Sequence, residues 1–287
     1  MDRYCVMGNP VEHSRSPWIH ARFAELTGQP IDYGRRLVPL GGFDGAVAAF
    51  RAEAAAQGGR AGGCNVTVPF KFDAAALATR RSERAGLAQA VNTLRFEADG
   101  GVYGDNTDGA GLVNDIERNA RRPLAGAELL LVGAGGAAAG VLGPLLQAGV
   151  RRLVVANRTL DKALVLVQRH AALALAQGTA LEAQPLDALP GLARFDVLVN
   201  GTAASLAGDA VPVPPGVLRE GALAVDMMYG ASAAGFLAWA RAQGAEPRDG
   251  LGMLVEQAAE SFTLWRGVAP PAAEVLAELR RIVDTAA

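Results

Sequence analysis

The chain has 287 residues, 51% of them hydrophobic, and its 27 basic and 29 acidic residues leave a net charge of −2. This length predicts two domains, each with a hydrophobic core, and the balanced charge excludes the basic surface that nucleic-acid binding requires. The cysteines and histidines are too few and too irregularly spaced for a disulfide framework or a metal site: Cys5, Cys64, His13, His20 and His170.

The N-terminal segment, MDRYCVMGNP, lacks the apolar run of a signal peptide and, with only two cysteines in the chain, favours a cytoplasmic protein. Residues 129–150 carry no charge over 22 positions and are long enough to span a membrane. Repeated glycines and Pro144 interrupt this stretch, and a strand, a glycine turn and a helix account for it better. We therefore expect no association with membranes.

Strands and helices alternate irregularly over the first hundred residues. Pro17 in the first turn and Ser16 as N-cap predict where the first helix begins. Asp99–Gly101 predicts the turn of a β-hairpin. The elements expected here are strands over 3–7, 32–40 and 63–68, helices over 17–26 and 43–57, the hairpin over 91–105 and a helix that starts near Thr107.

Beyond residue 121 the pattern becomes regular. The segment RRPLAG at 121–126 is typical of a linker, and two amphipathic helices, over about 251–266 and 271–285, close the chain. Strands that alternate with helices of this length predict βαβ units and a parallel sheet, so we expect an α/β fold of two α/β domains. The expected elements lie at 128–132, 137–148, 152–156, 160–176, 196–199 and 222–226.

The segment LLLVGAGGAA at 129–138 joins an apolar strand to a helix. Gly133, Gly135 and Ala138 match the G-x-G-x-x-G/A pattern of dinucleotide-binding turns. The first glycine permits a tight turn, the second lets the backbone approach a pyrophosphate, and the helix N-terminus attracts its charge. Small residues can also serve packing alone, but a strand before the motif and a helix after it favour a dinucleotide cofactor.

The end of the next strand indicates which dinucleotide this is. Proteins that bind NAD usually carry an acidic residue there, which holds the ribose 2′-hydroxyl. This chain has Asn157, Arg158 and Thr159 instead, with Lys162 soon after. The two cations would attract a 2′-phosphate that a carboxylate would repel, which favours NADP(H) over the alternative of a solvated helix start.

Lysine is rare, because the chain has two lysines against 25 arginines. One of them, Lys71, ends the segment NVTVPFK at 65–71 and follows an expected strand. Lysine can lose its proton in a desolvated site whereas arginine effectively cannot, so Lys71 is a candidate proton donor. The alternative is an ordinary surface lysine.

Polar residues gather where the expected strands end. They include Ser14 and Ser16, then Asn92 and Thr93, and then GDNTDGAG at 104–111, which contains Asp108. Asp108 would suit a helix start, where the dipole stabilises a carboxylate, and it would equally orient an ammonium partner such as Lys71. The sequence contains neither a Ser–His–Asp order nor a nucleophile elbow, which disfavours covalent acyl chemistry.

Eight motifs, in order along the chain, resemble the shikimate dehydrogenase family. They are GNPVEHSRSP at 8–17, NVTVPFK at 65–71, AVNTL at 90–94, GDNTDGAG at 104–111, VGAGGA at 132–137, NRT at 157–159, DMMY at 226–229 and DGLGMLVEQA at 249–258. The resemblance implies NADPH-dependent, reversible reduction of 3-dehydroshikimate to shikimate in aromatic amino acid (chorismate) biosynthesis. It also implies a substrate domain of residues 1–108 joined by 251–287, a Rossmann-type NADP-binding domain of residues 109–250, and a cleft between them.

The resemblance further implies roles for individual residues. Ser14, Ser16 and Thr67 match donors to the substrate carboxylate. Lys71 and Asp108 match the catalytic pair, while Asn92, Gln257 and Tyr229 match groups around the substrate ring. Cofactor-binding positions correspond to Gly133, Ala134, Gly135, Gly136, Ala137, Asn157, Arg158, Thr159, Lys162, Met227 and Gly250.

One departure from the family is visible. Where the family often has N-A-T-S, this chain has NGTA at 200–203 and lacks the last hydroxyl, which would loosen contacts beside the cofactor. Two other functions stay open: a quinate or mixed quinate/shikimate dehydrogenase, and a non-catalytic NADP-binding regulator. Arg158 argues against NAD, and the presence of both Lys71 and Asp108 argues against a regulator. We expect a small-molecule substrate as the partner, with a homodimer as one candidate assembly.

Overall fold

The computed structural model describes residues 1–192, 194–202 and 213–285. They pack as two compact units, one of Met1–Gly111 with Leu254–Leu279, the other of Leu112–Met253 with the residues from Arg280 onward. We expected all of 251–287 to join the N-terminal part. The end of the chain differs because the Arg280 guanidinium donates two hydrogen bonds, of 2.7 and 2.6 Å, to the Asp249 carboxylate of the second unit.

The first unit is built on a six-stranded sheet with the order β2-β1-β3-β5-β6-β4. β1 is parallel to β2 and β3, β5 is antiparallel to β3 and β6, and β4 is parallel to β6. The carboxyl ends of β1, β3 and β6 and the amino end of β5 therefore lie at one edge. The strands are β1 (Asp2–Gly8), β2 (Ile31–Leu37), β3 (Arg60–Val66), β4 (Arg80–Arg81), β5 (Thr93–Phe96) and β6 (Val102–Asp105).

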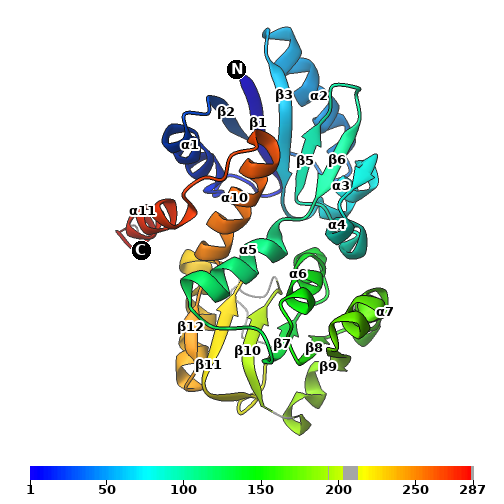
Figure 1. Ribbon diagram of the computed structural model, residues 1–287, viewed down its shortest axis with the longest axis vertical. Coiled ribbons are helices and arrows are strands. Elements are labelled where there is room, and N and C mark those ends of the chain that lie inside the picture. Colours follow the sequence, from blue (N-terminus) through cyan, green and yellow to red (C-terminus); the bar gives the residue numbers. More distant parts are fainter. Residues whose placement is uncertain (193, 203–212, 286–287) are drawn as a thin grey trace. The chain divides into compact units, whose positions relative to one another are not determined.

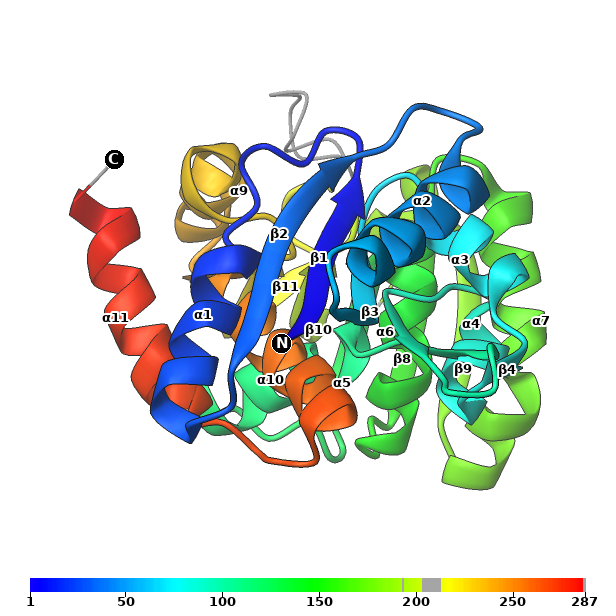
Figure 2. The same cartoon turned by 90° about the horizontal axis from the view of Figure 1, so that it is seen from above.

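Helices cover both faces of this sheet, with α1 and α10 on the side of β1 opposite α2 and α3 (Figure 2). On the α2 side, Phe43, Phe50 and Phe70 are buried in one apolar cluster. On the other side, the His20 ring stacks on Tyr33 with centroids 4.3 Å apart, and burial lowers the pKa of His20 to about 3. The helices are α1 (Ser16–Thr27), α2 (Phe43–Ala56), α3 (Lys71–Leu77), α4 (Glu83–Ala88), α10 (Leu251–Arg266) and α11 (Ala272–Thr285).

The second unit has a six-stranded sheet with the order β12-β11-β10-β7-β8-β9, in which every described pairing is parallel (Figure 1). This is the doubly wound order, which reverses between β7 and β10. Its elements are α5 (Asp108–Asn114), η1 (Asp115–Asn119), β7 (Glu128–Val132), α6 (Gly136–Gln147), β8 (Arg152–Asn157), α7 (Leu160–Gln177), β9 (Ala180–Pro185), η2 (Leu186–Gly191), β10 (Phe195–Asn200), β11 (Leu218–Asp226), η3 (Gly230–Ala233), α9 (Ala234–Ala242) and β12 (Glu246–Arg248).

The expectation of two α/β sheets is confirmed, with differences at the margins. Sequence analysis assigned no element to β9 or β12, which are the edge strands of their sheet and lack the continuous apolar run of β7. The segment 121–126 has no helix or strand, and it lies within the second unit. Residues 129–150 form β7, a turn and most of α6, and among the described residues no helix is long and apolar enough to cross a membrane.

The predicted N-cap role of Ser16 is wrong. The N-cap residue of α1 is Arg15, and no side chain makes a cap hydrogen bond there. Instead, the Ser16 backbone N–H donates to Ser14 Oγ at 3.3 Å, so the serine that satisfies a free amide at this helix start is Ser14. The two hydroxyl oxygens lie 3.2 Å apart.

Candidate active site

Lys71 and Asp108 form an ion pair at the edge of the first unit's sheet where β3 and β6 end. Each is the first residue of a helix, α3 and α5 respectively, and Lys71 Nζ lies 2.5 Å from Asp108 Oδ2. Their side chains are 14% and 8% exposed. A lysine held this way is partly desolvated and oriented, which suits an ammonium that exchanges a proton with a bound substrate.

Asn92 holds the other oxygen of this carboxylate. Its side-chain nitrogen donates to Asp108 Oδ1 at 2.9 Å and to Thr107 Oγ1 at 2.9 Å, and it lies 3.3 Å from Gln257 Oε1. Asn92 and Gln257 are both buried, at 3% and 8% exposure. The Asp108 carboxylate therefore has a fixed orientation, with one oxygen toward the amide and one toward the ammonium.

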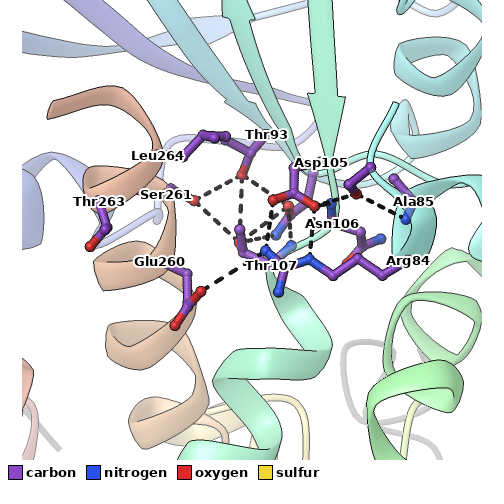
Figure 3. Close-up of polar contacts among 12 residues, drawn as sticks. Arg84, Ala85, Thr93, Asp105, Asn106, Thr107, Glu260, Ser261, Thr263 and Leu264 are labelled. Carbon is purple, nitrogen blue, oxygen red and sulfur yellow. Dashed lines mark hydrogen bonds and ion pairs between the residues drawn. The ribbon is translucent and has the colours of Figure 1, made fainter. Parts of the chain in front are cut away.

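A cluster of hydroxyl groups lies behind Asn92. Thr93, Thr107 and Ser261 come from β5, the β6–α5 loop and α10, and Figure 3 shows them pointing toward one another. Thr93 Oγ1 is 2.8 Å from Ser261 Oγ, and Thr107 Oγ1 is 3.2 Å from it. All three residues are fully buried, so these hydroxyls serve other protein groups and not solvent.

The Asp105 carboxylate stabilises the loop that leads to Asp108 by accepting several hydrogen bonds. It accepts hydrogen bonds from Arg84 at 2.8 and 2.6 Å, from the Ser82 hydroxyl at 2.5 Å and from the Asn106 backbone at 2.7 Å (Figure 3). Burial alone would raise the pKa of Asp105, but the hydrogen bonds and charge of Arg84 outweigh it and hold this pKa below its usual value. The loop is thus tied to the N-cap residue of α4, which is Ser82.

The residues expected to hold a carboxylate follow β1 and β3. Ser16 is buried, and Ser14 and Thr67 are half-buried. The Ser14 carbonyl accepts two hydrogen bonds from the exposed Arg35 guanidinium, at 3.0 and 2.7 Å. Both loops lie at the same sheet edge as Lys71 because β1 and β3 are parallel. Neutral hydroxyls beside a fixed guanidinium suit a carboxylate.

The glycine turn of the second unit lies where its strand order reverses, the usual place for a ligand in an open parallel sheet. Gly133 has φ 112°, and an added Cβ would stand 3.0 Å from the Gly201 carbonyl oxygen after β10, so this position requires glycine. A Cβ added to Gly135 would meet no atom within 4 Å. Gly135 is the N-cap residue of α6, so the backbone is open to a pyrophosphate at that helix N-terminus.

Other predicted cofactor positions surround this turn. Asn157 ends β8, and its side-chain nitrogen donates to the Thr159 carbonyl at 2.8 Å. Arg158 and Lys162 are exposed, and no ion pair involves them within the part of the chain that the structure describes. Two unneutralised cations beside a neutral asparagine fit a 2′-phosphate. Ala134 lies in the same turn, and Gly136 and Ala137 are the first two residues of α6.

Met227 and Gly250 lie near the end of β10. The Met227 backbone N–H donates to the Asn200 carbonyl at 3.1 Å. An added Cβ on Gly250 would stand 2.4 Å from the Met227 carbonyl oxygen, so the two backbones touch. Tyr229 precedes η3 in this unit, and its expected place beside the substrate stays a prediction. Ala203, the departure from the family pattern, lies outside the described residues.

Sequence reasoning missed several groups that shape this site. Arg35 and Arg84 are two of 25 arginines, and nothing local distinguishes them. Ser261 could have been predicted from the sequence, because it follows Gln257 by four residues and therefore lies on the same helix face. Thr107 lies within the GDNTDGAG motif, where the sequence indicates only a helix start.

Comparisons with known proteins show which family this chain resembles. Residues 6–94 match the shikimate dehydrogenase substrate binding domain, residues 116–207 match shikimate / quinate 5-dehydrogenase, and residues 250–280 match the shikimate 5'-dehydrogenase C-terminal domain. A shikimate dehydrogenase (NADP(+)) of Methylibium petroleiphilum is 64% identical, over 99% of this chain and 96% of that protein.

Two solved structures share the fold over nearly the whole chain. An Ael1 enzyme from Pseudomonas putida has 46% identity and a TM-score of 0.86, covering 97% of this chain and 98% of its own. Shikimate 5-dehydrogenase from Thermus thermophilus, solved in complex with NADP(H) and shikimate, has 31% identity and a TM-score of 0.81, covering 98% of this chain and 99% of its own.

Proposed function

The chain belongs to the shikimate dehydrogenase family, and from this premise we propose that it catalyses the NADPH-dependent, reversible reduction of 3-dehydroshikimate to shikimate. The observation that carries the proposal is the Lys71–Asp108 pair, with Nζ 2.5 Å from Oδ2 and Asn92 on the other carboxylate oxygen. An ammonium held in this way is placed to protonate an alkoxide that forms beside it.

NADPH, when bound, supplies the hydride. The residues that fit it are the open backbone at Gly135, the turn at Gly133 and the exposed cations Arg158 and Lys162. Asn157 is neutral and therefore does not repel the 2′-phosphate, as an acidic residue at this position would.

In the direction of reduction, Lys71 donates a proton from Nζ to the oxygen of the carbonyl as that oxygen gains negative charge. Asp108 keeps the ammonium oriented beforehand and balances its charge, and it becomes the acceptor partner of a neighbouring substrate hydroxyl. In the reverse direction the neutral lysine amine takes the proton from the substrate hydroxyl.

Ser14, Ser16 and Thr67 hold the substrate carboxylate, and Asn92 and Gln257 hold ring hydroxyls. Each of these contacts fixes the ring relative to Lys71. The residues that make them contribute to catalysis by positioning the substrate and not by taking part in the chemical step. The first unit therefore acts as the substrate-holding part and the second as the cofactor-holding part.

The experiment that tests this function is a two-by-two assay. Absorbance of the reduced nicotinamide is followed with shikimate or quinate, each with NADP+ or NAD+. The proposal expects rapid turnover for shikimate with NADP+ and much slower turnover in the other three mixtures. Equal rates with quinate would make this a mixed quinate/shikimate dehydrogenase, and no turnover in any mixture would leave only an NADP-binding role.

Location and assembly are finer proposals. Cys5 and Cys64 are both buried free thiols, which supports a reducing compartment, and we place the activity in the cytoplasm. We also propose a homodimer. Sedimentation at micromolar concentration tests it, and a monomer over that range would remove it.

A further inference from the structure

Thr93 follows Asn92 directly in the chain, yet its side chain has no expected contact with substrate. Its hydroxyl lies 2.9 Å from Asn92 Oδ1, 3.0 Å from Asn65 Nδ2 and 2.8 Å from Ser261 Oγ. Thr93 is 0% exposed. A hydroxyl buried this fully, with three polar partners, has its rotor position set by the donors and acceptors around it.

The donors and acceptors settle which way the hydroxyl points. Asn65 Nδ2 can only donate, so Thr93 Oγ1 accepts from it. Asn92 Oδ1 can only accept, so Thr93 is the donor in the 2.9 Å contact between them. Because this uses the single hydrogen of Thr93, the 2.8 Å contact with Ser261 is a hydrogen bond that the Ser261 hydroxyl donates to Thr93 Oγ1.

Three donors converge on Asn92 Oδ1, since the Thr107 backbone N–H and the Thr107 hydroxyl also donate to it, at 2.8 and 3.2 Å. A carboxamide has one acceptor end and one donor end, so fixing the oxygen fixes the nitrogen. With Oδ1 facing Thr93 and Thr107, Nδ2 must face Asp108. A reversed amide would point its oxygen at the Asp108 carboxylate and leave these donors without Oδ1 as their acceptor, which is unfavourable at a buried site.

We propose that Thr93, supported by Ser261, is a positioning residue for the dehydrogenase reaction, because its hydroxyl fixes the orientation of the Asn92 carboxamide that holds Asp108 against Lys71. This rests on the proposed function. Thr93 acts on the Lys71–Asp108 ion pair through Asn92, to which it hydrogen-bonds directly. Ser261, on α10, links this role to the helix that carries Gln257.

The test compares Thr93→Val, which removes the hydroxyl at nearly constant shape, with Thr93→Ser, which keeps it. The control is Thr179→Val in the second unit, where a 7% exposed threonine loses a 2.7 Å hydrogen bond to the Val150 carbonyl. Steady-state oxidation of shikimate by NADP+ gives kcat and both KM values, and thermal unfolding reports folding.

We expect Thr93→Val to lower kcat by about 10- to 100-fold, the scale of a catalytic group displaced by up to an ångström, with the KM for NADP+ unchanged. Thr93→Ser should restore most of kcat, and Thr179→Val should leave kcat near wild type. If Thr93→Val does not fold, Ser261→Ala replaces it, with a smaller loss in the same parameter expected. A folded Thr93→Val or Ser261→Ala enzyme with wild-type kcat overturns the proposal.

A double-mutant cycle separates positioning from a general structural defect. Once Asn92 is replaced by alanine there is no carboxamide to orient, so Thr93→Val should cost no further activity in the Asn92→Ala background. Full additivity of the two losses would overturn the proposal.

The result is distinguishable from failure of the proposed function. A wild-type enzyme that does not oxidise shikimate with NADP+ contradicts the function and not the positioning. In that case NMR decides, because hydrogen exchange at the Asn92 side-chain NH2 should quicken in Thr93→Val and not in Thr179→Val. Unchanged exchange would overturn the role of Thr93 whatever the substrate is.

Discussion

In the first unit, the groups expected to bind the substrate are side chains that hydrogen-bond to one another. In the second unit, the groups expected to bind the cofactor are a glycine backbone and exposed cations. Lys71, Asp108 and Asn92 are connected to one another by hydrogen bonds. Gly135 and Arg158, by contrast, face open space or solvent. The first site therefore depends on the geometry of linked side chains, and the second on the space and charge beside its glycine turn.

This difference predicts where single substitutions act on rate and where they act on affinity. Loss of a group from the connected side chains of the first unit should lower kcat, because the chemistry depends on their geometry. Loss of a group from the second unit should weaken cofactor binding and leave the rate of the loaded enzyme closer to normal.

The largest effect is expected for Lys71→Ala, which removes the proton donor. General acid–base catalysis supplies about 10²–10⁴-fold, or roughly 3–5 kcal/mol of barrier, so most of kcat should be lost. Fluorescence titration should show NADPH affinity unchanged. Lys71→Arg keeps the positive charge, but arginine does not release its proton. If kcat recovers little in this variant while the KM for shikimate is unchanged, the role of Lys71 is proton transfer. Substantial activity in the alanine variant would remove Lys71 from the mechanism.

Gly135→Ala probes the open backbone of the second unit. The added methyl group meets no protein atom within 4 Å, so the thermal midpoint should stay near wild type. The methyl would occupy the space of the pyrophosphate and weaken NADPH and NADH alike, by about 10- to 100-fold if one charge-assisted hydrogen bond is lost. Gly235→Ala, which also meets nothing, is the matched control. Tight cofactor binding by Gly135→Ala would contradict a pyrophosphate site there.

Arg158→Ala should weaken NADPH binding by about 10-fold and leave NADH nearly unchanged, because only NADPH carries the 2′-phosphate. The effect is modest since Arg158 is exposed, and it should shrink as salt is raised. Arg241→Ala, an exposed arginine on α9, serves as control. An equal loss for both cofactors would show that Arg158 supports the fold and does not contact the phosphate.

A separate prediction concerns how the stability of the first unit depends on pH. His20 has a pKa of about 3 when folded and about 6.5 when unfolded. The unfolded chain therefore binds more protons between these values, and the free energy of unfolding should fall as pH drops below 6.5, by up to about 1.4 kcal/mol per pH unit. Urea unfolding at pH 7.5 and 5 should show a smaller drop for His20→Phe, while the exposed His13→Gln should match wild type. Equal drops in all three would contradict this assignment.

Sequence reasoning worked best where the determinants are local. The turn at Gly133–Gly135 was predicted from adjacent residues, because a strand, two glycines and a helix start define it within ten positions. The same local reasoning failed at Ser16, where the neighbouring Ser14 hydroxyl accepts the backbone N–H and leaves the predicted cap without a role.

The first unit's site was harder to predict because its residues are distant in sequence. Lys71 and Asp108 are 37 residues apart, and Asn92 and Gln257 are 165 apart. Taken alone, Lys71 is more typical of a surface lysine, and Asp108 fits a helix start equally well. The strand order brings their loops to one sheet edge, and no periodicity in the sequence reports strand order. Roles for these residues came from the resemblance to a family and not from spacing.

The return of α10 to the first unit has a consequence for how the protein is made. About 140 residues of the second unit separate Gly111 from Leu254, which at roughly 5–20 residues per second takes about 7–30 s to synthesise. During that interval the nascent N-terminal sheet lacks Gln257, Ser261 and Trp265, whose indole N–H bonds the Leu94 carbonyl. The part of the chain translated first is therefore the part completed last, and its α1 face stays uncovered until α10 has been synthesised.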